Sequence, residues 1–184
     1  MFAVGHLALG YLTGKLTSKL LNVKTNVSLL FLTSVLPDID LLIPWLEHRG
    51  PTHSLIVYAV IFAPAFFLYG KQTVPLFASL AQHSLLGDLV SGKGTQMLWP
   101  AVSEWYGVQV QITGALNIFL EWAAFLMAMA LLWKTKEVMS LFQHHPSNLL
   151  LTIPVFAIVL PSFLSFPFAV PPALIIPHFV FLTL

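Results

Sequence analysis

Apolar segments follow one another along almost the whole chain, and most of them are long enough to cross a lipid bilayer as helices. Hydrophobic residues make up 58% of the 184 residues and charged residues only 8%, whereas soluble domains carry about 25% charged residues. The sequence therefore predicts an integral membrane protein. Its length allows about six to seven spans of about 20 residues each, which leaves little room for a separate soluble domain.

The expected spans are separated by lysine, proline or glycine. They cover residues 2–18, 26–46, 54–70, 73–92 and 115–133, and the segment 148–184 is long enough for two more. Repeated prolines in that last segment remove helical donors, so we expect two broken or tilted helices with a proline-rich turn between them. These prolines are Pro154, Pro161, Pro167, Pro171, Pro172 and Pro177. The chain is thus predicted to be one all-α transmembrane helical bundle over residues 1–184.

Composition excludes several classes of function. A formal net charge of +1 offers no basic surface for nucleic acid, and the absence of cysteine excludes disulfides and thiolate metal sites. The first apolar segment has no positively charged region before it and contains a histidine, so we do not expect a cleaved signal peptide. The longest expected loop, 93–114, contains Trp99, Trp105 and Tyr106, which are typical of a lipid–water boundary.

Ionisable side chains gather in three short motifs, "PDID", "HRGPTH" and "HSLLGD". With one early histidine, these motifs hold all three aspartates and four of the seven histidines. A charge at the centre of a span costs about 2.5 to 3.5 kcal/mol, so such residues pair, line a cavity or bind something. A cation would satisfy all of them, and imidazole with carboxylate suits zinc, manganese or iron rather than calcium. The candidate ligands are His6, Asp38, Asp40, His48, His53, His83 and Asp88.

The local sequence favours convergence of most of these groups. Pro37 breaks the preceding helix, so the two aspartates that follow it need not point to opposite sides. Gly50 and Pro51 predict a tight turn that lets His48 and His53 face one point. His83 and Asp88 are different, because they are five residues apart. Residues with this separation on an ideal α-helix share a face poorly unless Gly87 ends the helix.

Each residue also has a structural interpretation. An aspartate after proline often caps a helix, a histidine in an apolar segment such as His6 is often a core residue, and Arg49 near a span end could extend to lipid headgroups. These explanations do not account for the clustering of the aspartates and most histidines between residues 6 and 88. His144 and His145 in a polar loop, and His178 near the C-terminus, are left out of the predicted site.

The motifs resemble those of the YdjM-like membrane-bound metal-dependent hydrolases, some members of which are described as LexA-regulated. The resemblance rests on the early histidine, "LPDID", "HRGPTHS", "HSLLGD" followed by "GTQMLWP", and an acidic residue after "TG", over roughly residues 1–125. The family is distantly similar to zinc-dependent phospholipase C, whose histidines and aspartates bind a metal cluster that cleaves phosphoesters. Members commonly separate the histidine and aspartate of the third motif by four residues, whereas His83 and Asp88 are five apart.

The leading hypothesis is a metal-dependent hydrolase of a phosphoester in a lipid-linked substrate, which uses metal-activated water. Seven candidate ligands exceed the three or four that one catalytic zinc takes from protein, so we expect two ions, zinc or alternatively manganese or iron, about 3.5 to 4 Å apart. Arg49, the only arginine, is the candidate for bidentate contact with a phosphate. Glu121 is a further ligand, an outer partner of a histidine, or the catalytic base, and the sequence does not choose among these.

Two other classes of function fit the same residues. A transition-metal or ion transporter would use the histidines and aspartates as a transit site, although such sites usually lie near the midplane and often accompany an inverted repeat, which we do not find. A pseudo-enzyme would bind metal for stability alone. The sequence does not identify the headgroup of the substrate or the oligomeric state.

Charge along the expected loops predicts an orientation. Loops on one side hold six lysines and those on the other side only two basic residues, so the positive-inside rule places the first side in the cytoplasm and the ligands on the extracytoplasmic side. The six are Lys15, Lys19, Lys24, Lys71, Lys134 and Lys136, and the two are Arg49 and Lys93.

Overall fold

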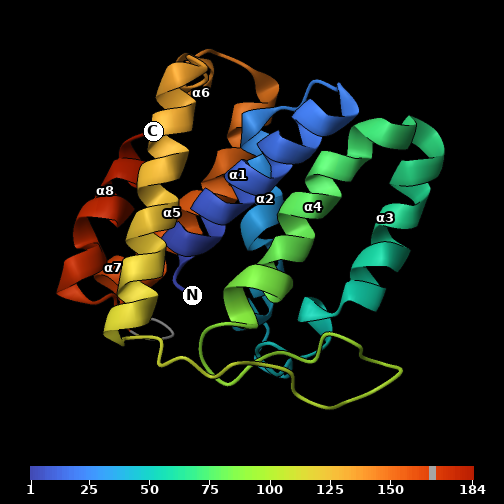
Figure 1. Cartoon of the computed structure of the whole chain (residues 1–184), viewed down its shortest axis with the longest axis vertical. Helices are drawn as coiled ribbons and strands as arrows, with labels where there is room; N and C mark the ends of the chain where they lie inside the picture. Colours follow the sequence, from blue (N-terminus) through green and yellow to red (C-terminus); the bar gives the residue numbers. More distant parts are fainter. Residues whose placement is uncertain (166–168) are drawn as a thin grey trace.

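A computed structural model describes residues 1–165 and 169–184, and the described residues form helices without strands (Figure 1). The α-helices are α1 (Ala3–Leu21), α2 (Val27–Val35), α3 (Leu55–Tyr69), α4 (Val74–Gln82), α5 (Ala115–Lys134), α6 (Val138–Leu141), α7 (Thr152–Phe163) and α8 (Ile175–Thr183). Short 3₁₀ segments are η1 (Leu36–Leu42), η2 (Pro51–His53), η3 (Gly70–Thr73), η5 (Pro146–Leu151) and η6 (Pro172–Leu174), and η4 (His83–Asp88) is a π-helical turn.

Helix α1 lies in the middle of the bundle and packs against α2, α4 and α5 (Figure 1). Its side chains Leu7 and Tyr11 are fully buried, with Leu30 of α2 and Leu132 of α5 in the same hydrophobic core. Figure 1 shows α3 at one side of this core and α7 with α8 at the other. The first half of α1, from Ala3 to Tyr11, is apolar on all its faces except for His6, and such a helical segment is expected to be surrounded in this way.

Three helical stretches in the described residues are long and apolar enough to cross a membrane: Leu55–Asp88, Ala115–Lys134 and Pro146–Phe163. The first of them is not straight, because η3 reverses the chain and α3 and α4 run antiparallel beside each other (Figure 1). The prediction of an all-α fold with helices that can span a membrane is confirmed. The count of six to seven spans stays a prediction.

The C-terminal segment forms two helices, α7 and α8, where two spans were expected. Pro161 lies inside α7, and Pro171 and Pro172 precede α8. Pro167, which belongs to the predicted proline-rich turn, lies outside the described residues.

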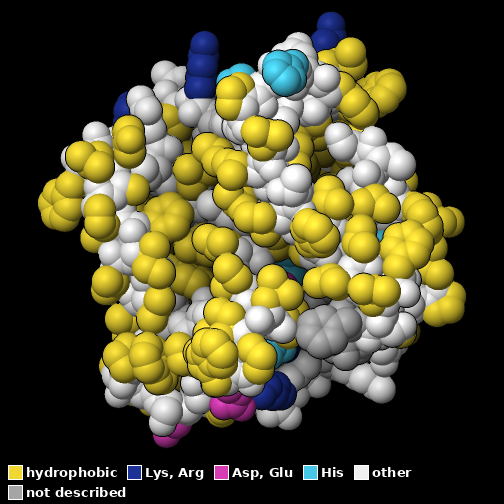
Figure 2. All heavy atoms as spheres, turned by 180° about the vertical axis from the view of Figure 1, so that it is seen from behind, with side chains coloured by type: hydrophobic (Ala, Val, Ile, Leu, Met, Phe, Trp, Pro, Cys, Tyr) yellow, Lys and Arg dark blue, Asp and Glu magenta, His cyan; other side chains and the backbone are white. Residues whose placement is uncertain are grey.

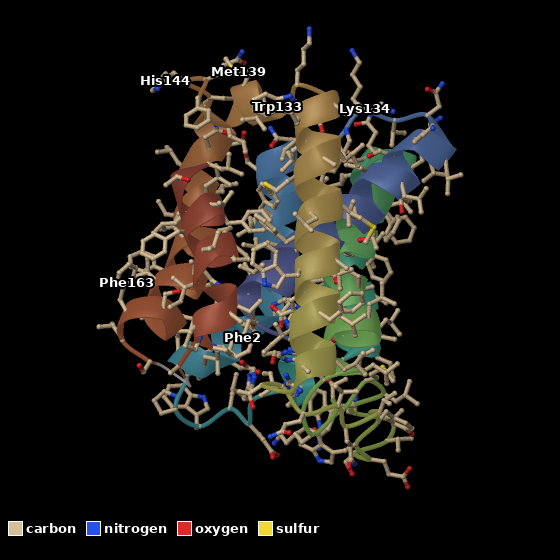
Figure 3. All side chains as sticks on the ribbon, turned by 60° about the vertical axis from the view of Figure 1, so that its left-hand side comes forward. Phe2, Trp133, Lys134, Met139, His144 and Phe163 are labelled. Atoms are coloured by element: carbon tan, nitrogen blue, oxygen red, sulfur yellow. The ribbon has the colours of Figure 1, made fainter. Side chains whose placement is uncertain are left out.

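Charged groups lie at the two ends of the bundle. Figure 2 shows hydrophobic side chains over most of one face, with basic side chains projecting at the upper end and acidic side chains next to a basic one at the lower end. Lys134, Met139 and His144 lie together at the upper end in Figure 3, whereas Phe2 lies toward the lower end. The long loop between η4 and α5 also lies at the lower end (Figure 1). An apolar belt between two polar ends is the pattern that a bilayer requires.

Candidate metal centre

Four segments from three regions of the sequence bring histidines and aspartates to the lower end of the bundle. The first turns of α1 supply one histidine, η1 supplies two aspartates, the turn before α3 supplies two histidines, and η4 supplies a histidine and an aspartate. The groups of ligand atoms that lie close enough to share an ion are His6 with Asp38 and His83, Asp38 with His48 and His53, and His53 with His83 and Asp88.

Four atoms form the centre of this cluster. Nε2 of His53 lies 3.5 Å from Oδ1 of Asp38 and 3.1 Å from Oδ2 of Asp88. Nε2 of His83 lies 3.3 Å from each of the same two oxygens. For an ion bonded at about 2.0 to 2.2 Å to nitrogen and oxygen, the ligand atoms of a tetrahedral site lie about 3.3 to 3.5 Å apart. The four nitrogen–oxygen distances are close to this spacing, so they fit a divalent ion held by the two histidines with either aspartate, although Asp38 and Asp88 belong to different groups of ligand atoms.

Hydrogen bonding within the cluster supports the same interpretation. Nε2 of His53, Nε2 of His83 and Oδ2 of Asp88 are buried and have no hydrogen-bond partner. Buried polar atoms are normally paired, and leaving one unpaired costs about 1 to 3 kcal/mol. A cation held among these three atoms would satisfy all of them.

The charges of the cluster also need a cation. Asp38, Asp40 and Asp88 contribute three negative charges. Arg49 and the N-terminal ammonium of Met1, which lies 3.5 Å from Oδ1 of Asp88, contribute two positive charges, which leaves one negative charge when the histidines are neutral. Burial by itself lowers the pKa of the His53 imidazole, but the proximity of the three surrounding carboxylates outweighs burial and holds that pKa well above its usual value. The carboxylates thus hold a proton on the ring, and a metal ion would take the place of that proton.

The π-helical turn η4 explains how His83 and Asp88 meet. The N–H of Leu89 donates to the carbonyl of Ser84, five residues earlier, at 2.9 Å. A π-turn has more residues per turn than an α-helix, so side chains five apart lie on one face. The expectation that this spacing separates the two groups is wrong, because the extra residue is absorbed in the wider turn.

Gly87 does not end the helix but lies inside η4, where it makes room for His6. A Cβ at this position would clash with the imidazole of His6. The ring of His6 stacks on that of His83, with centroids 3.6 Å apart and planes 10° from parallel. Nε2 of His6 lies 3.5 Å from Oδ1 of Asp88, and its Nδ1 is buried without a hydrogen-bond partner. His6 is therefore beside the four-atom centre rather than an ordinary core residue.

Asp38 and Asp40 contact opposite nitrogens of the same ring. Oδ1 of Asp38 faces Nε2 of His53, whereas Oδ2 of Asp40 lies 3.3 Å from Nδ1. Asp38 makes no hydrogen bond that caps η1, so the structural interpretation of this aspartate as a cap is wrong. The predicted Asp40 ligand lies on the far side of the histidine, in the place of a carboxylate that orients a metal-binding imidazole.

Asp40 has further partners that fix it. Its Oδ2 accepts hydrogen bonds from the hydroxyl of Thr52 at 2.6 Å and from the backbone N–H of Arg49 at 3.2 Å. Its Oδ1 lies 3.0 Å from Nδ1 of His48, whose ring reaches the same edge of the cluster. This carboxylate therefore ties together both histidines of the turn.

The second central histidine, His83, has its orientation fixed by the backbone. Nδ1 of His83 donates to the carbonyl of Ser34 at 2.7 Å, which leaves an unprotonated lone pair on Nε2 for an ion. Sequence reasoning missed this partner, since a backbone carbonyl leaves no signal in the residue type. Thr52 lies inside the "HRGPTH" motif and could have been found, because a hydroxyl next to a candidate ligand is a common outer partner.

The Arg49 side chain does not extend outward to the headgroups of the surrounding bilayer, because the residue is only 5% exposed. Its Nη2 donates to Oδ1 of Asp88 at 2.8 Å and its Nη1 donates to the carbonyl of Ser91. The residue adopts φ +69, which costs energy in a residue with a side chain. A Cβ at Gly92 would clash with the guanidinium, so the glycine is needed for this position.

Glu121 lies apart from the cluster. Its Oε1 accepts hydrogen bonds from the backbone N–H of Phe2 and the side chain of Asn117, both at 2.8 Å. It belongs to none of the groups of ligand atoms found in the described residues. Its contacts hold the beginning of α1, which carries His6, and its predicted catalytic role stays a prediction.

The three histidines left out of the predicted site lie elsewhere. His145 hydrogen-bonds to Ser147 in the loop before α7, and His144 lies at the upper end (Figure 3). His178 is buried in α8 and its Nδ1 donates to the carbonyl of Leu174 at 2.7 Å.

A cavity of about 430 Å³ adjoins the centre. Asp38, His48, Arg49 and Asp88 are its charged or imidazole-bearing lining residues. The other lining residues are apolar and come from the beginning of α1, from Val35 and η1, and from α7. The C-terminal part of the chain thus forms a wall beside ligands that the first part supplies.

The sequence matches the family model of the YdjM inner membrane proteins over residues 1–167. The chain belongs to this family. It is therefore an integral membrane protein, in agreement with the apolar helices, and the predicted family is confirmed. No curated protein and no solved structure matches the chain. The similarity of YdjM proteins to zinc-dependent phospholipase C stays a prediction.

Proposed function

We propose that this YdjM family member is a membrane-embedded, metal-dependent hydrolase that cleaves a phosphoester in a lipid-linked substrate. One observation carries the proposal: Asp38 and Asp88, which contact both His53 and His83, line the polar part of an otherwise apolar cavity. A binding site for a lipid with a charged headgroup needs a polar cluster and an apolar cavity side by side.

The donor set suits a divalent transition metal. His53, His83, Asp38 and Asp88 offer two imidazole nitrogens and two carboxylate oxygens, a mixture that zinc, manganese and iron accept. A second ion, if present, would use His6 or His48 with shared Asp38, in line with the two outer groups of ligand atoms. A bound metal would polarise a phosphoryl oxygen and activate a water molecule.

The other residues of the chain would position the reacting groups. Arg49 lines the cavity and presents the only guanidinium beside the ligands, so it would bind the anionic oxygens of the headgroup. Asp40 and the carbonyl of Ser34 would keep His53 and His83 in the orientation that binds metal. Burial of the centre would strengthen each of these electrostatic contacts.

We test this function by measuring metal and turnover together. Purified protein in lipid nanodiscs should contain transition metal and hydrolyse a long-chain phosphodiester, and Asp38→Ala should lose both. Folded wild-type protein without metal and without any turnover in added zinc, manganese or iron would overturn the proposal. If the protein retains metal but shows no turnover, the result would instead favour a pseudo-enzyme that binds metal only for stability.

The transporter alternative makes a different prediction. The ligand cluster lies at one end of the bundle, next to the long loop, whereas a transit site is expected near the midplane (Figure 1). Liposomes that contain the protein should therefore show no flux of zinc or manganese. Flux that Asp38→Ala abolishes would reverse the choice between the two functions.

We also propose that the site faces the extracytoplasmic side. Contacts between elements support the grouping of lysines at the upper end: Lys15 pairs with Glu137 at 2.5 Å, and Lys71 donates to the carbonyl of Leu21 at 3.5 Å. Lys134 lies at the same end (Figure 3), whereas Arg49 belongs to the metal centre at the lower end. The excess of lysine favours the upper end as cytoplasmic.

Single cysteines test this orientation, since the chain has none of its own. A membrane-impermeant thiol reagent added to intact cells should label a cysteine at Thr52 and not one at Ser140. Labelling at residue 140 alone would show that the orientation is wrong.

A further inference from the structure

We propose that the cavity between η1 and α7 holds one hydrocarbon chain of the substrate, which enters sideways from the bilayer while its phosphate lies at Arg49 and the metal centre. The inference rests on the proposed function for the identity of the headgroup site. It adds the place where the hydrocarbon chain of that lipid binds and the route by which the lipid reaches the centre.

The lining of the cavity divides into a polar part and an apolar part. The polar groups are joined by direct contacts, since Arg49 pairs with Asp88 at 2.8 Å and both Asp88 and Asp38 lie 3.3 Å from Nε2 of His83. On α7 the lining residues are Ile153, Phe156, Ala157, Leu160 and Pro161, and none of them offers a side-chain polar atom. A small polar ester would make no apolar contact with the side chains of α7 that line the cavity.

The position of the walls indicates the route of entry. Ile39 and Leu42 of η1 line the cavity, yet their side chains are also exposed on the apolar surface, by 48% and 64%. Ile153 and Phe156 on α7 combine the same two properties. The cavity therefore reaches the lipid-facing surface between these elements, and a chain can enter it without leaving an apolar environment.

An anionic headgroup would be held by Arg49 together with the metal of the proposed centre, since the carboxylates alone would repel it. Arg49 is the only cationic side chain among the lining residues, and its guanidinium geometry suits phosphate oxygens. A volume of about 430 Å³ lies within the range of about 300 to 1,000 Å³ that is typical of small-ligand sites. One hydrocarbon chain with its headgroup is the occupant that fits the apolar wall, the lateral opening and the positive charge together.

The test uses dodecyl phosphate with a diazirine at the end of its chain, added to the protein in phosphatidylcholine nanodiscs. Photolysis should attach the probe to α7 or η1 within the cavity. Excess dodecyl phosphate should compete, whereas butyl phosphate and inorganic phosphate should not, which separates binding of a lipid from binding of a free phosphate.

Ala157→Phe places a ring in the cavity and should reduce labelling about tenfold, because overpacking excludes the chain. Ala59→Phe is the matched control, since Ala59 lies exposed on α3, away from the cavity, and it should leave labelling unchanged. Metal content and melting temperature show whether each variant folds. Ile39→Phe tests the opposite wall and should have the same effect if Ala157→Phe does not fold.

Labelling spread evenly over the lipid-exposed helices, or labelling of α7 that folded Ala157→Phe and Ile39→Phe leave unchanged, would overturn the inference. Equal competition by inorganic phosphate would also contradict the inference, because the hydrocarbon chain of the probe would then contribute nothing to binding. These outcomes are independent of turnover. Specific labelling without any hydrolysis would support the lipid site while rejecting the proposed enzyme.

Discussion

The two ends of the bundle both contain paired charges, but the pair at the upper end is half-buried and complete, whereas the cluster at the lower end is mostly buried and has unpaired atoms. At the upper end one carboxylate meets one ammonium: Glu137 pairs with Lys15 at 2.5 Å, and its other oxygen accepts a hydrogen bond from Tyr11 at 2.7 Å. At the lower end the guanidinium of Arg49 and the N-terminal ammonium both pair with Asp88, and no lysine, arginine or ammonium group forms an ion pair with Asp38 or Asp40 in the described residues. Two histidine nitrogens and a carboxylate oxygen of this cluster are buried without hydrogen-bond partners.

This difference separates a structural ion pair from a ligand site. The upper group connects α1 to the turn after α5, and both oxygens of its carboxylate have a partner within the protein. The lower group is incomplete, because its charges do not cancel and its unpaired atoms point at one another. Removing residues from the two ends should therefore affect different properties, the stability at one end and the metal content at the other.

The largest expected effect comes from His83→Ala. This change removes one of the four central atoms, so metal in the purified protein should fall below about one tenth of the wild-type content. His178→Ala is the matched control, because His178 is also buried but lies in α8 and belongs to no group of ligand atoms in the described residues. Elemental analysis of both variants measures the difference. Equal metal content in the two would show that the lower end is not a metal centre.

A smaller loss of metal is expected for Asp40→Asn. The amide keeps its size but interacts less well with Nδ1 of His53, and outer partners of this kind are worth about 10- to 100-fold in metal affinity. Titration with a chelating dye measures that affinity. Glu137→Gln, the same change at the upper end, should leave affinity unaltered. Complete loss of metal in folded Asp40→Asn would make Asp40 a direct ligand, as the sequence alone suggested.

The sequence predicted where most helices begin, because each follows from an apolar segment, but not how long they are: the expected spans 26–46 and 73–92 contain the short helices α2 and α4, which end at Val35 and Gln82. It also predicted which residues meet, since an aspartate or histidine at membrane depth needs a partner. Asn26 and Ser54, whose side chains cap α2 and α3, lie close to the expected beginnings of their spans.

Other features depend on geometry that residue types do not encode. The π-turn at His83–Asp88 could not be predicted from the period of an α-helix, and it determines whether these two groups meet. The different places of Asp38 and Asp40 around His53 follow from the tertiary approach of η1 to the turn before α3. The contribution of α7 to the cavity was missed as well, because an apolar helix carries no signal of which neighbour it covers.

Arg49→Lys should change substrate binding more than metal. Lysine keeps the charge but loses the fork that reaches both Asp88 and the carbonyl of Ser91, so we expect KM for the phosphoester to rise about tenfold with metal content retained. Lys93→Arg is the control, since Lys93 is exposed and pairs with Glu47 outside the cavity. Unchanged kinetics of folded Arg49→Lys would remove Arg49 from the binding site.

The smallest effect is expected at the upper end. Glu137→Gln removes the ion pair with Lys15 but retains an acceptor for Tyr11, so the free energy of unfolding should fall by about 1 kcal/mol or less. Reversible unfolding in mixed micelles measures this change. A loss of metal in Glu137→Gln would contradict the division of roles between the two ends.

The central claim is that one divalent ion binds among His53, His83, Asp38 and Asp88. Crystals of the purified protein, measured at the absorption edge of the metal that elemental analysis identifies, test it most directly through anomalous scattering. The account predicts an anomalous peak about 2.0 to 2.2 Å from Nε2 of both histidines and from an oxygen of each aspartate. Metal-containing crystals with no peak at this place, or with the peak at His144 and His145 instead, would contradict it.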